Sequence, residues 1–117
     1  MSDINNEPKR EWKKVKNKLL GENAIVESVE GNSMTVTRYE INKQVTIPLH
    51  YHDYEQIIYV LEGEMNLVVE NEQFFMKAGD IKVILGNEKH SAEIVGVPFK
   101  SIESYYPKRT DLVIDEL

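Results

Sequence analysis

Three histidines are the residues of this chain whose spacing best suits metal chemistry. His50 and His52 are two residues apart in a stretch that is largely apolar or β-branched, which is typical of a strand. Residues two apart on a strand project from the same face, so we expect both imidazole rings to point the same way. Gln56 follows across a short polar bend and adds a side-chain oxygen. Two imidazoles with an oxygen donor nearby form the beginning of a metal site.

The third histidine lies in a second segment made of turns and a strand. Turn residues at 78–80 and 86–89 enclose a strand-like run at 81–85, and His90 follows directly. A single histidine on an apolar strand is usually a packed or hydrogen-bonded residue. These three positions account for every histidine in the chain, and histidines scattered for packing alone are not expected to fall in this arrangement.

The first segment resembles the first sequence motif of the cupin family. That motif reads His-x-His, then an acidic or amide residue after three or four positions, then Gly after six more. Here it is matched by His50, His52, Gln56 and Gly63.

The second segment resembles the second cupin motif, in which Gly is followed at fixed spacing by Pro, a second Gly and His. Gly79 and His90 have that spacing. Leu85 stands in place of the Pro, Asn87 in place of the second Gly, and Ile94 in place of the motif's terminal Asn. The resemblance covers roughly residues 24–106 and implies the cupin fold and metal binding. It says little about the reaction, because cupins host many chemistries.

The resemblance implies a divalent metal ion held by His50, His52, Gln56 and His90. Histidine and glutamine side chains accept nickel, zinc, manganese, cobalt or iron, so the sequence leaves the identity of the metal open. The alternative is a degenerate cupin that keeps these residues but binds a small molecule without metal.

Glu55 is the alternative to Gln56 as the fourth ligand. A step of one residue on a strand reverses the face, so the two side chains cannot both point inward. The spacing to Gly63 favours Gln56. Three neutral imidazoles and a neutral amide leave the full charge on a divalent metal, which favours Lewis-acid chemistry and an anionic substrate.

Short strand-like runs follow one another closely through the middle of the chain. They cover residues 24–29, 34–41, 45–52, 56–61, 64–70, 72–77, 81–85, 90–95 and 99–106. With no convincing helix among them, this density predicts an all-β sandwich or barrel. The jelly-roll β-barrel of cupins fits that count. We expect a single barrel domain over residues 21–117, preceded by a partly ordered basic arm over residues 1–20.

The arm differs from the rest of the chain in charge. Residues 1–18 carry six of the 14 basic residues, whereas the remainder has eight basic and 17 acidic residues. Trp12, Val15 and Leu19 recur at helical spacing, so the arm could dock as a short helix on its own domain or on a partner subunit. The alternative is a solvated terminus.

Composition limits the class of protein. A length of 117 residues suits one domain, and the absence of cysteine excludes a disulfide framework and thiol chemistry. The sequence shows no apolar run of membrane-spanning length and no signal-peptide pattern, so we expect a cytoplasmic protein without a membrane partner. The net charge of -6 argues against nucleic acid as a partner. Exposed strand edges and the arm make a homodimer the expected assembly.

The C-terminal part of the chain resembles the end of small cupins of pectin and alginate degradation. Those enzymes open the ring of 4,5-unsaturated uronate monosaccharides to a linear keto form. Their closing pattern is matched in order and spacing by Glu103, Tyr105, Pro107, Arg109 and Asp111, with Glu103 standing where those enzymes have Asp.

This resemblance implies roles for three residues. Glu103 would move a proton during hydration and tautomerisation of the enol ether, Arg109 would clamp the sugar carboxylate, and Tyr105 would form a wall of the pocket. Each has a plainer alternative. Arg109 could be a surface cation paired with Asp111, and Tyr105 could be a core residue.

Three classes of function follow from the sequence. The first is a metal-dependent isomerase or lyase-like enzyme acting on a small sugar acid. The second is another metal-cupin enzyme, such as a dioxygenase or an epimerase, and oxygen consumption with redox-active iron would distinguish it. The third is a non-catalytic cupin that binds a small molecule.

Overall fold

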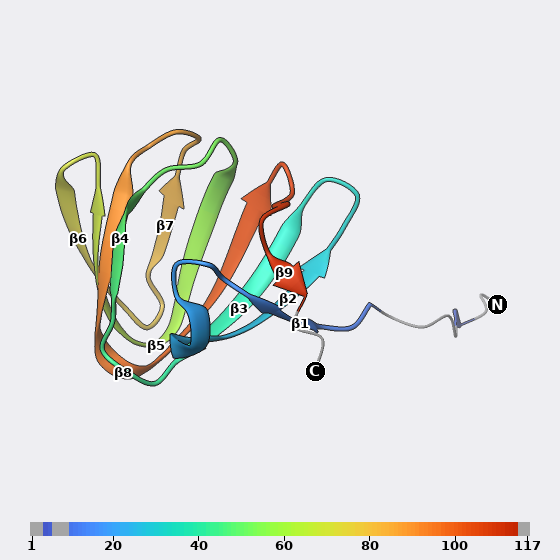
Figure 1. The fold of residues 1–117 in the computed structure, drawn as a ribbon, viewed down its shortest axis with the longest axis horizontal. Coiled ribbons are helices and arrows are strands. Elements are labelled where there is room, and N and C mark those ends of the chain that lie inside the picture. Colours follow the sequence, from blue (N-terminus) through green and yellow to red (C-terminus); the bar gives the residue numbers. More distant parts are fainter. Residues whose placement is uncertain (1–3, 6–9, 115–117) are drawn as a thin grey trace.

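The computed structural model describes residues 4–5 and 10–114 and is built almost entirely of strands. In chain order the elements are β1 (Lys13–Lys16), the 3₁₀ turn η1 (Gly21–Asn23), β2 (Ile25–Glu30), β3 (Thr35–Ile41), β4 (Thr46–His50), β5 (Glu55–Val69), β6 (Glu72–Lys77), β7 (Ile81–Ile84), β8 (His90–Tyr106) and β9 (Val113–Ile114) (Figure 1). The sequence-based prediction of an all-β fold in a single domain is confirmed.

Two long strands, β5 and β8, run side by side through both layers of the molecule. The first part of β5 pairs with β7 and with the end of β8, whereas its last part pairs with β6 and with the beginning of β8. One layer therefore has the order β4-β8-β5-β6, and the other has the order β7-β5-β8-β3-β2-β1-β9. Both long strands bend at the lower edge of Figure 1, and the folded sheet stays open, as in a jelly roll.

Gly63 lies at the point where β5 bends from one layer into the other. Its φ is +84°, and a Cβ there would lie 2.5 Å from the carbonyl oxygen of Gly96 and 2.6 Å from that of Pro98. Only glycine fits this close approach of two backbones. The β5–β8 register shifts on both sides of Glu62, so the bend is made by irregular pairing rather than by a chain break.

The strand boundaries expected from the sequence need three corrections. Runs 56–61 and 64–70 are one strand, and runs 90–95 and 99–106 are another. Gly63 and the Gly96–Pro98 segment resemble strand ends in the sequence, because glycine and proline are common there. In the structure they lie at bends inside continuous strands. The run expected to continue to residue 52 also ends earlier, at His50.

Buried and exposed side chains alternate along the strands, and the buried ones form the interior. On β3, the buried residues Thr35, Thr37, Tyr39 and Ile41 alternate with more exposed neighbours. On β5, the buried residues occur two apart on either side of the Gly63 bend. This period of two sends one face of each layer into the shared interior. The largest fully buried apolar side chains include Phe99, Ile41, Leu67, Ile84 and Ile94.

The N-terminal segment docks as a strand and a 3₁₀ turn, not as the short helix that its spacing suggested. Val15 of β1 is 5% exposed and pairs with Val26 of β2 and Ile114 of β9. Asn17, two residues further on, is also buried, so burial follows a strand period. Trp12 lies against Arg38, whose guanidinium carbon is 4.3 Å from the ring centroid. Lys9 of the basic arm lies outside the described residues.

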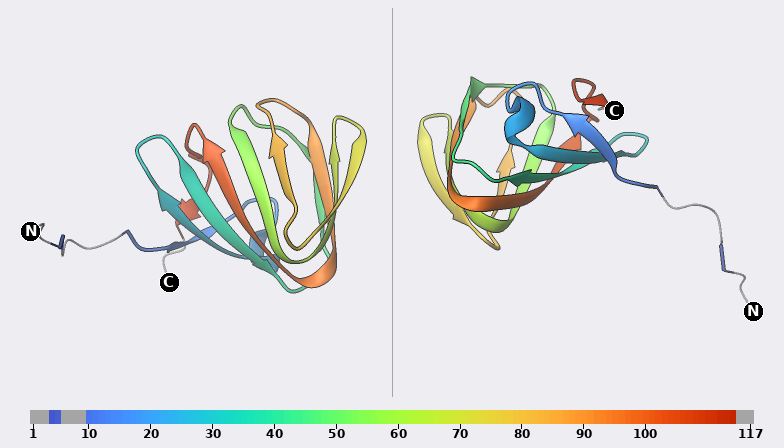
Figure 2. Two further views of the ribbon diagram at one scale, coloured as in Figure 1. Left: turned by 180° about the vertical axis from the view of Figure 1, so that it is seen from behind. Right: turned by 60° about the horizontal axis from the view of Figure 1, so that its bottom comes forward.

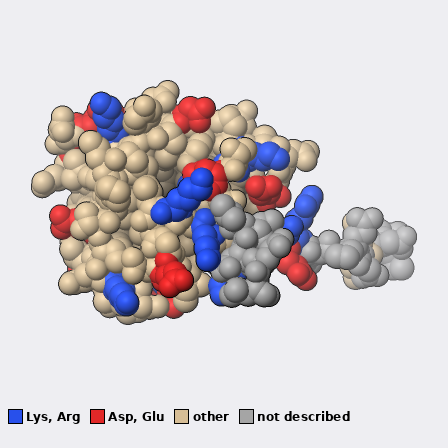
Figure 3. All heavy atoms as spheres, in the orientation of Figure 1, with Lys and Arg blue, Asp and Glu red and all other residues tan. Residues whose placement is uncertain are grey.

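The face of the molecule that is seen in Figure 3 carries charges of both signs. In the orientation of Figure 1, Lys and Arg side chains alternate with Asp and Glu side chains, and uncharged surface separates them (Figure 3). Figure 2 shows the fold from two further sides, with β1 and β9 at the end of the molecule away from β6. Within residues 4–5 and 10–114, no helix has the length and apolar character needed to cross a membrane.

Removing residues 1–19 should lower the melting temperature. The truncation removes β1, its pairing with two strands, and the buried Val15 side chain. Burial of a valine alone is worth about 1.5–3 kcal/mol, so we expect a decrease of about 5 °C or more by differential scanning calorimetry. Val15→Ser should reproduce part of the loss, and Lys14→Ser at the exposed neighbour should not. An unchanged melting temperature in the truncated protein would show that the segment is a free tail.

Candidate functional site

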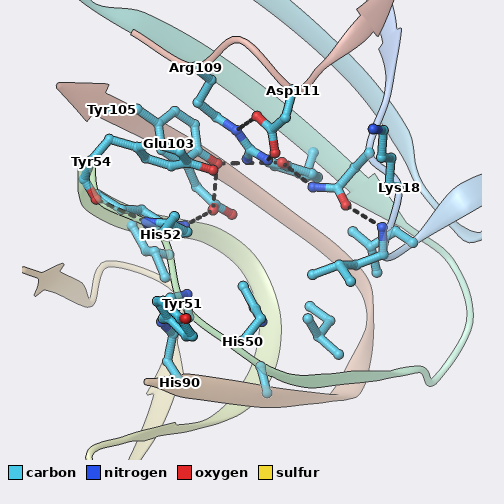
Figure 4. A pocket seen from close by; sticks show the side chains of 18 of the residues that line it. Lys18, His50, Tyr51, His52, Tyr54, His90, Glu103, Tyr105, Arg109 and Asp111 are labelled. Atoms are coloured by element: carbon cyan, nitrogen blue, oxygen red, sulfur yellow. Dashed lines mark hydrogen bonds and ion pairs between the residues drawn. The ribbon is translucent and has the colours of Figure 1, made fainter. Parts of the chain in front are cut away.

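The three histidines converge on one point of the interior. His50 ends β4 and pairs across the layer with His90, the first residue of β8, and His52 lies just beyond β4. Ring centroids are 4.2 Å apart for His50 and His90, 4.9 Å for His52 and His90, and 6.0 Å for His50 and His52. One ring nitrogen from each histidine lies within 4.8 Å of the other two, a grouping that could hold a metal ion (Figure 4).

A backbone carbonyl faces Nδ1 of each of the three rings. In each case Nδ1 lies within hydrogen-bonding distance of a carbonyl oxygen two residues away. A carbonyl can only accept, so a neutral ring donates its Nδ1–H there and leaves the Nε2 lone pair free. The distances are 2.7 Å from His50 to Pro48, 2.9 Å from His52 to Tyr54 and 2.8 Å from His90 to Glu88.

Burial keeps two of these rings neutral at pH 7. It lowers the pKa of His90 to about 4 and also lowers the pKa of His52, even though each ring donates a hydrogen bond to a backbone carbonyl. The neutral imidazole is the form that binds metal, so no proton has to leave these two rings before a cation binds at neutral pH.

Gln56 connects this cluster to a carboxylate. Its side chain is 7% exposed, whereas Glu55 is exposed, so the side-chain directions follow the register expected from the spacing to Gly63. Gln56 Nε2 donates to Glu103 Oε1 at 2.7 Å, and this bond turns the amide oxygen toward His52. Gln56 Oε1 then lies 3.0 Å from His52 Nε2.

The contact between Gln56 and His52 tests whether these residues suit a metal. With Nδ1 of His52 donating to a carbonyl, its Nε2 carries a lone pair, and the facing Gln56 oxygen carries lone pairs as well. Two acceptors 3.0 Å apart have no hydrogen to share between them. A cation would satisfy both, so the donor set fits a divalent metal with nitrogen and oxygen ligands.

Glu103, on β8, receives three hydrogen bonds. Gln56 Nε2 and the Tyr105 hydroxyl donate to Oε1 at 2.7 and 3.2 Å, and the Ser101 hydroxyl donates to Oε2 at 2.6 Å. Burial raises the pKa of Glu103, while these donors and the nearby Arg109 act in the opposite direction. A half-buried carboxyl group with a raised pKa, at the wall of a cavity, suits proton transfer.

The sequence left two interpretations of Arg109 open, a cavity residue that binds a carboxylate or a surface cation paired with Asp111. The structure has features of both. Arg109 is only 9% exposed, and its Nε and Nη2 donate to the two carboxylate oxygens of Asp111 at 2.9 and 2.7 Å. These bonds hold the pKa of Asp111 below its ordinary value. The same guanidinium lines the cavity and lies 4.7 Å from the ring centroid of Tyr105 and 5.2 Å from that of Tyr54. Arg109 is therefore paired but not on the surface.

All of these side chains line one cavity of about 590 Å³. Glu103, Tyr105 and Arg109 lie together on one side of the three histidines (Figure 4). Tyr54 stacks on His52 with centroids 3.9 Å apart and nearly parallel rings, which supports the imidazole from one side. A cavity of this volume accommodates a small organic ligand.

Several residues that line the cavity or bond to its side chains were not anticipated from the sequence. Tyr39, Ser101 and Tyr54 contact the predicted site residues, and Asn17 and Lys18 bring the N-terminal segment to the cavity. The alternating pattern of 35–41 indicates which face Tyr39 occupies, so that residue was within reach of sequence reasoning. Nothing local to Asn17 indicates its position, because its contact is with a strand 22 residues away.

Fold, histidine cluster and sequence identify the chain as a cupin. Residues 37–101, more than half of its length, match the family described as Cupin domain, so the chain belongs to that family. A curated relative, the pectin degradation protein KdgF of Dickeya dadantii (strain 3937), is 34% identical over 65 residues. The match spans 55% of this chain and 59% of that relative, less than two thirds of the relative's length.

Solved structures share the fold. KdgF from Halomonas sp. superposes with a TM-score of 0.73 at 22% identity and covers 92% of this chain and 94% of its own. An RmlC-like cupin from Shewanella frigidimarina also gives a TM-score of 0.73, at 21% identity, covering 85% of this chain and 87% of that one. This chain is thus a small cupin that resembles the pectin-degradation cupins.

Replacing His52 by Ala should abolish stoichiometric metal binding. The substitution removes one imidazole from the cluster and leaves the Gln56 oxygen without its partner. We expect elemental analysis of protein purified without added metal to give near one equivalent for the wild type and near zero for the variant. Glu55→Gln, at the exposed neighbour, is the matched control and should keep its metal. Full metal content in His52→Ala would overturn this assignment.

Proposed function

We propose that this protein is a metal-dependent enzyme that opens the ring of 4,5-unsaturated uronate monosaccharides derived from pectin or alginate. The observation that carries the proposal is the Gln56 amide. Its oxygen faces the histidine cluster and its nitrogen is bonded to Glu103, so a candidate metal centre and a candidate proton-transfer group lie one side chain apart in the same cavity.

The relatives support the same class of substrate. The curated relative from Dickeya dadantii is a pectin degradation protein, and the solved KdgF structure shares the fold over nearly the whole chain. The pattern Glu103, Tyr105, Pro107, Arg109 and Asp111 adds a resemblance outside the part of the chain that matches the family.

The proposed ligands of the metal are His50, His52, Gln56 and His90. A bound divalent cation would supply Lewis-acid polarisation of a substrate oxygen, undiminished by any ligand charge. Nickel, zinc, manganese, cobalt and iron all suit this donor set. The backbone bonds at Nδ1 keep the three rings in the required orientation before the cation arrives.

Glu103 is the proposed proton-transfer residue. Ring opening breaks the bond between the anomeric carbon and the ring oxygen, the anomeric hydroxyl loses its proton to become a carbonyl, and the ring oxygen remains on C5 as an enol. Protonation of C4 and loss of the enol proton then give the keto group, so the product is an isomer of the substrate. Glu103 would carry a proton between these positions, and its raised pKa suits both taking and giving it.

Arg109 is the proposed partner of the substrate carboxylate. Its two bonds to Asp111 leave three of the five N–H donors of a guanidinium without a partner among the described residues. Asp111 therefore orients the guanidinium group and leaves donors for a substrate carboxylate. Tyr54 and Tyr105 hold the guanidinium plane from neighbouring positions, and Tyr105 forms part of the cavity wall.

Enzyme loaded with metal should consume the unsaturated monosaccharides. The conjugated enol ether absorbs in the ultraviolet, so ring opening appears as loss of that band. Glu103→Gln should lower kcat by about 10²-fold or more with substrate binding kept, and Arg109→Ala should mainly raise KM. Arg38→Ala removes a cation from the exposed face of β3 and serves as the control, with unchanged kinetics expected.

An unchanged band with both pectin- and alginate-derived monomers would contradict the proposal. Oxygen consumption by an iron-loaded protein would then support a dioxygenase, and sugar binding without turnover would support a binding role.

We also propose that the protein is a homodimer whose arm, residues 1–20, extends the barrel domain of residues 21–117. Exposed apolar side chains alternate along the outer face of β5 and β7: Ile57, Tyr59, Ile81 and Val83 are 41, 39, 63 and 40% exposed. Ile57 pairs with Val83 and Tyr59 with Ile81, so the four form one continuous patch suited to a second copy.

The homodimer proposal is tested by mass in solution. Light scattering should give twice the chain mass for the wild type and the single-chain mass for Ile81→Glu. Leu49→Glu, at a 66% exposed leucine on β4, should leave the dimer intact. A monomeric wild type would contradict the proposal.

A further inference from the structure

A chain of hydrogen bonds joins the N-terminal segment to Glu103. The Asn17 side chain is buried at 8% exposure, and its Nδ2 donates to the Tyr39 hydroxyl oxygen at 3.0 Å. The Tyr39 and Tyr105 hydroxyls are 3.4 Å apart, and the Tyr105 hydroxyl donates to Glu103 Oε1 at 3.2 Å. Asn17 lies next to β1, whereas Tyr39 is on β3 and the other two residues are on β8.

The direction of this chain is set at Asn17. Its Oδ1 accepts the backbone N–H of Leu19 at 2.9 Å, so the amide presents Nδ2, and not oxygen, to Tyr39. Tyr39 therefore receives a hydrogen at its oxygen and keeps its own hydroxyl hydrogen for Tyr105. Tyr105 in turn directs its hydrogen to the carboxylate, which can only accept.

Thr37 completes the surroundings of the two tyrosines. Its hydroxyl lies 3.4 Å from the Tyr105 hydroxyl and 3.3 Å from the backbone carbonyl of Glu103. Thr37 has one hydroxyl hydrogen for these two acceptors and gives none to Tyr39, so the direction set at Asn17 is unchanged. The described side chains of this region contain no buried polar atom without a hydrogen-bond partner. The donors of the chain, which are Asn17 Nδ2, the Tyr39 hydroxyl and the Tyr105 hydroxyl, follow one another toward Glu103.

We propose that Asn17 is a positioning residue for the reaction, acting through Tyr39 and Tyr105 to hold a hydroxyl donor on Glu103. The proposal rests on the proposed function in taking Glu103 as the proton-transfer residue. It gives the N-terminal segment a part in the chemistry of the site, in addition to its packing on β2. The segment delivers the one amide whose orientation decides which way the two hydroxyls donate.

Asn17→Asp is the most informative variant. It keeps the shape of the side chain and replaces the donor that faces Tyr39 by an acceptor. A carboxylate at position 17 can accept from Leu19 N–H but cannot donate to Tyr39, so the Tyr39 hydroxyl turns to it. The Tyr39 oxygen then competes with Glu103 for the Tyr105 hydrogen. We expect kcat to fall about 10- to 100-fold, the range found when an outer hydrogen-bond partner is lost, with KM nearly unchanged. Asn23→Asp, in the exposed turn η1, is the matched control and should keep wild-type kinetics.

Tyr39→Phe provides the second variant, since it breaks the chain without adding a charge to the interior. It should lower kcat by a similar factor. In the Tyr39→Phe background, Asn17→Asp should have little further effect, because the connection through which it acts is already broken. Equal losses from Asn17→Asp in both backgrounds would overturn the proposal, as would wild-type kcat in either folded single variant.

A spectroscopic measurement separates this proposal from the proposed function. The ¹³C resonance of the Glu103 carboxyl group and the hydroxyl proton of Tyr105 should both shift in Asn17→Asp and stay in place in Asn23→Asp. If the wild type leaves all unsaturated uronates unchanged, the proposed function fails, and these two resonances still decide whether Asn17 controls the donor on Glu103. Unshifted resonances in folded Asn17→Asp would show that it does not.

Discussion

The pairing of β5 with β8 is the constraint on which the site depends. It sets Gln56 opposite Tyr105 and Ile58 opposite Glu103 at one end, and Val69 opposite His90 at the other. Because both strands continue through the bend at Gly63, a candidate metal ligand and a candidate proton-transfer residue have their relative positions fixed by backbone hydrogen bonds. A slip of β5 by one residue against β8 would turn Gln56 away from the cavity and break its bond to Glu103. Strands hold His50, Gln56, His90 and Glu103, whereas His52 and Arg109 lie in the segments that follow β4 and β8.

The choice of glutamine at position 56 follows from its two neighbours. A glutamine amide can accept a cation at its oxygen while its nitrogen donates to Glu103. A glutamate in the same place would set two carboxylates within hydrogen-bonding distance, and their repulsion would force a proton onto one of them. The amide would thus leave the charge of a bound cation undiminished, and it keeps the Glu103 carboxylate hydrogen-bonded. The same bond determines that the amide oxygen, and not the nitrogen, faces His52, so Gln56 connects the histidine cluster to Glu103.

The sequence predicts the features of the fold and site that have a periodic or local signal. The spacing of His50, His52 and Gly63 sufficed to predict which face of the strand Gln56 occupies, and alternation predicted the strands. The sequence does not predict features that depend on a contact between distant parts of the chain. Gly63 resembles the end of a strand in the sequence, but its position is determined by the Gly96 carbonyl that lies against it. The segment around Val15 has helical spacing, but pairing partners on both sides make it a strand.

The departures from the cupin motifs are accommodated locally. Asn87 stands where the family motif has a second glycine, and it adopts the left-handed conformation with φ of 67°, which asparagine tolerates better than most residues. Its backbone N–H donates to the carbonyl of His52 at 2.7 Å, so the turn still supports the histidine. Leu85, in place of the motif's proline, is 55% exposed and does not line the cavity.

The longer side chain at position 103 has a similar explanation. Glutamate carries one methylene more than the aspartate of the pectin-degradation cupins, and here that length lets one carboxylate meet Gln56, Ser101 and Tyr105 together. An aspartate on the same backbone would end about 1.5 Å short of at least one of them. The three donors, including the hydroxyl that Asn17 directs through Tyr39, are therefore matched to a glutamate. The departure is part of a consistent local arrangement, in which the carboxylate, its donors and the N-terminal segment depend on one another.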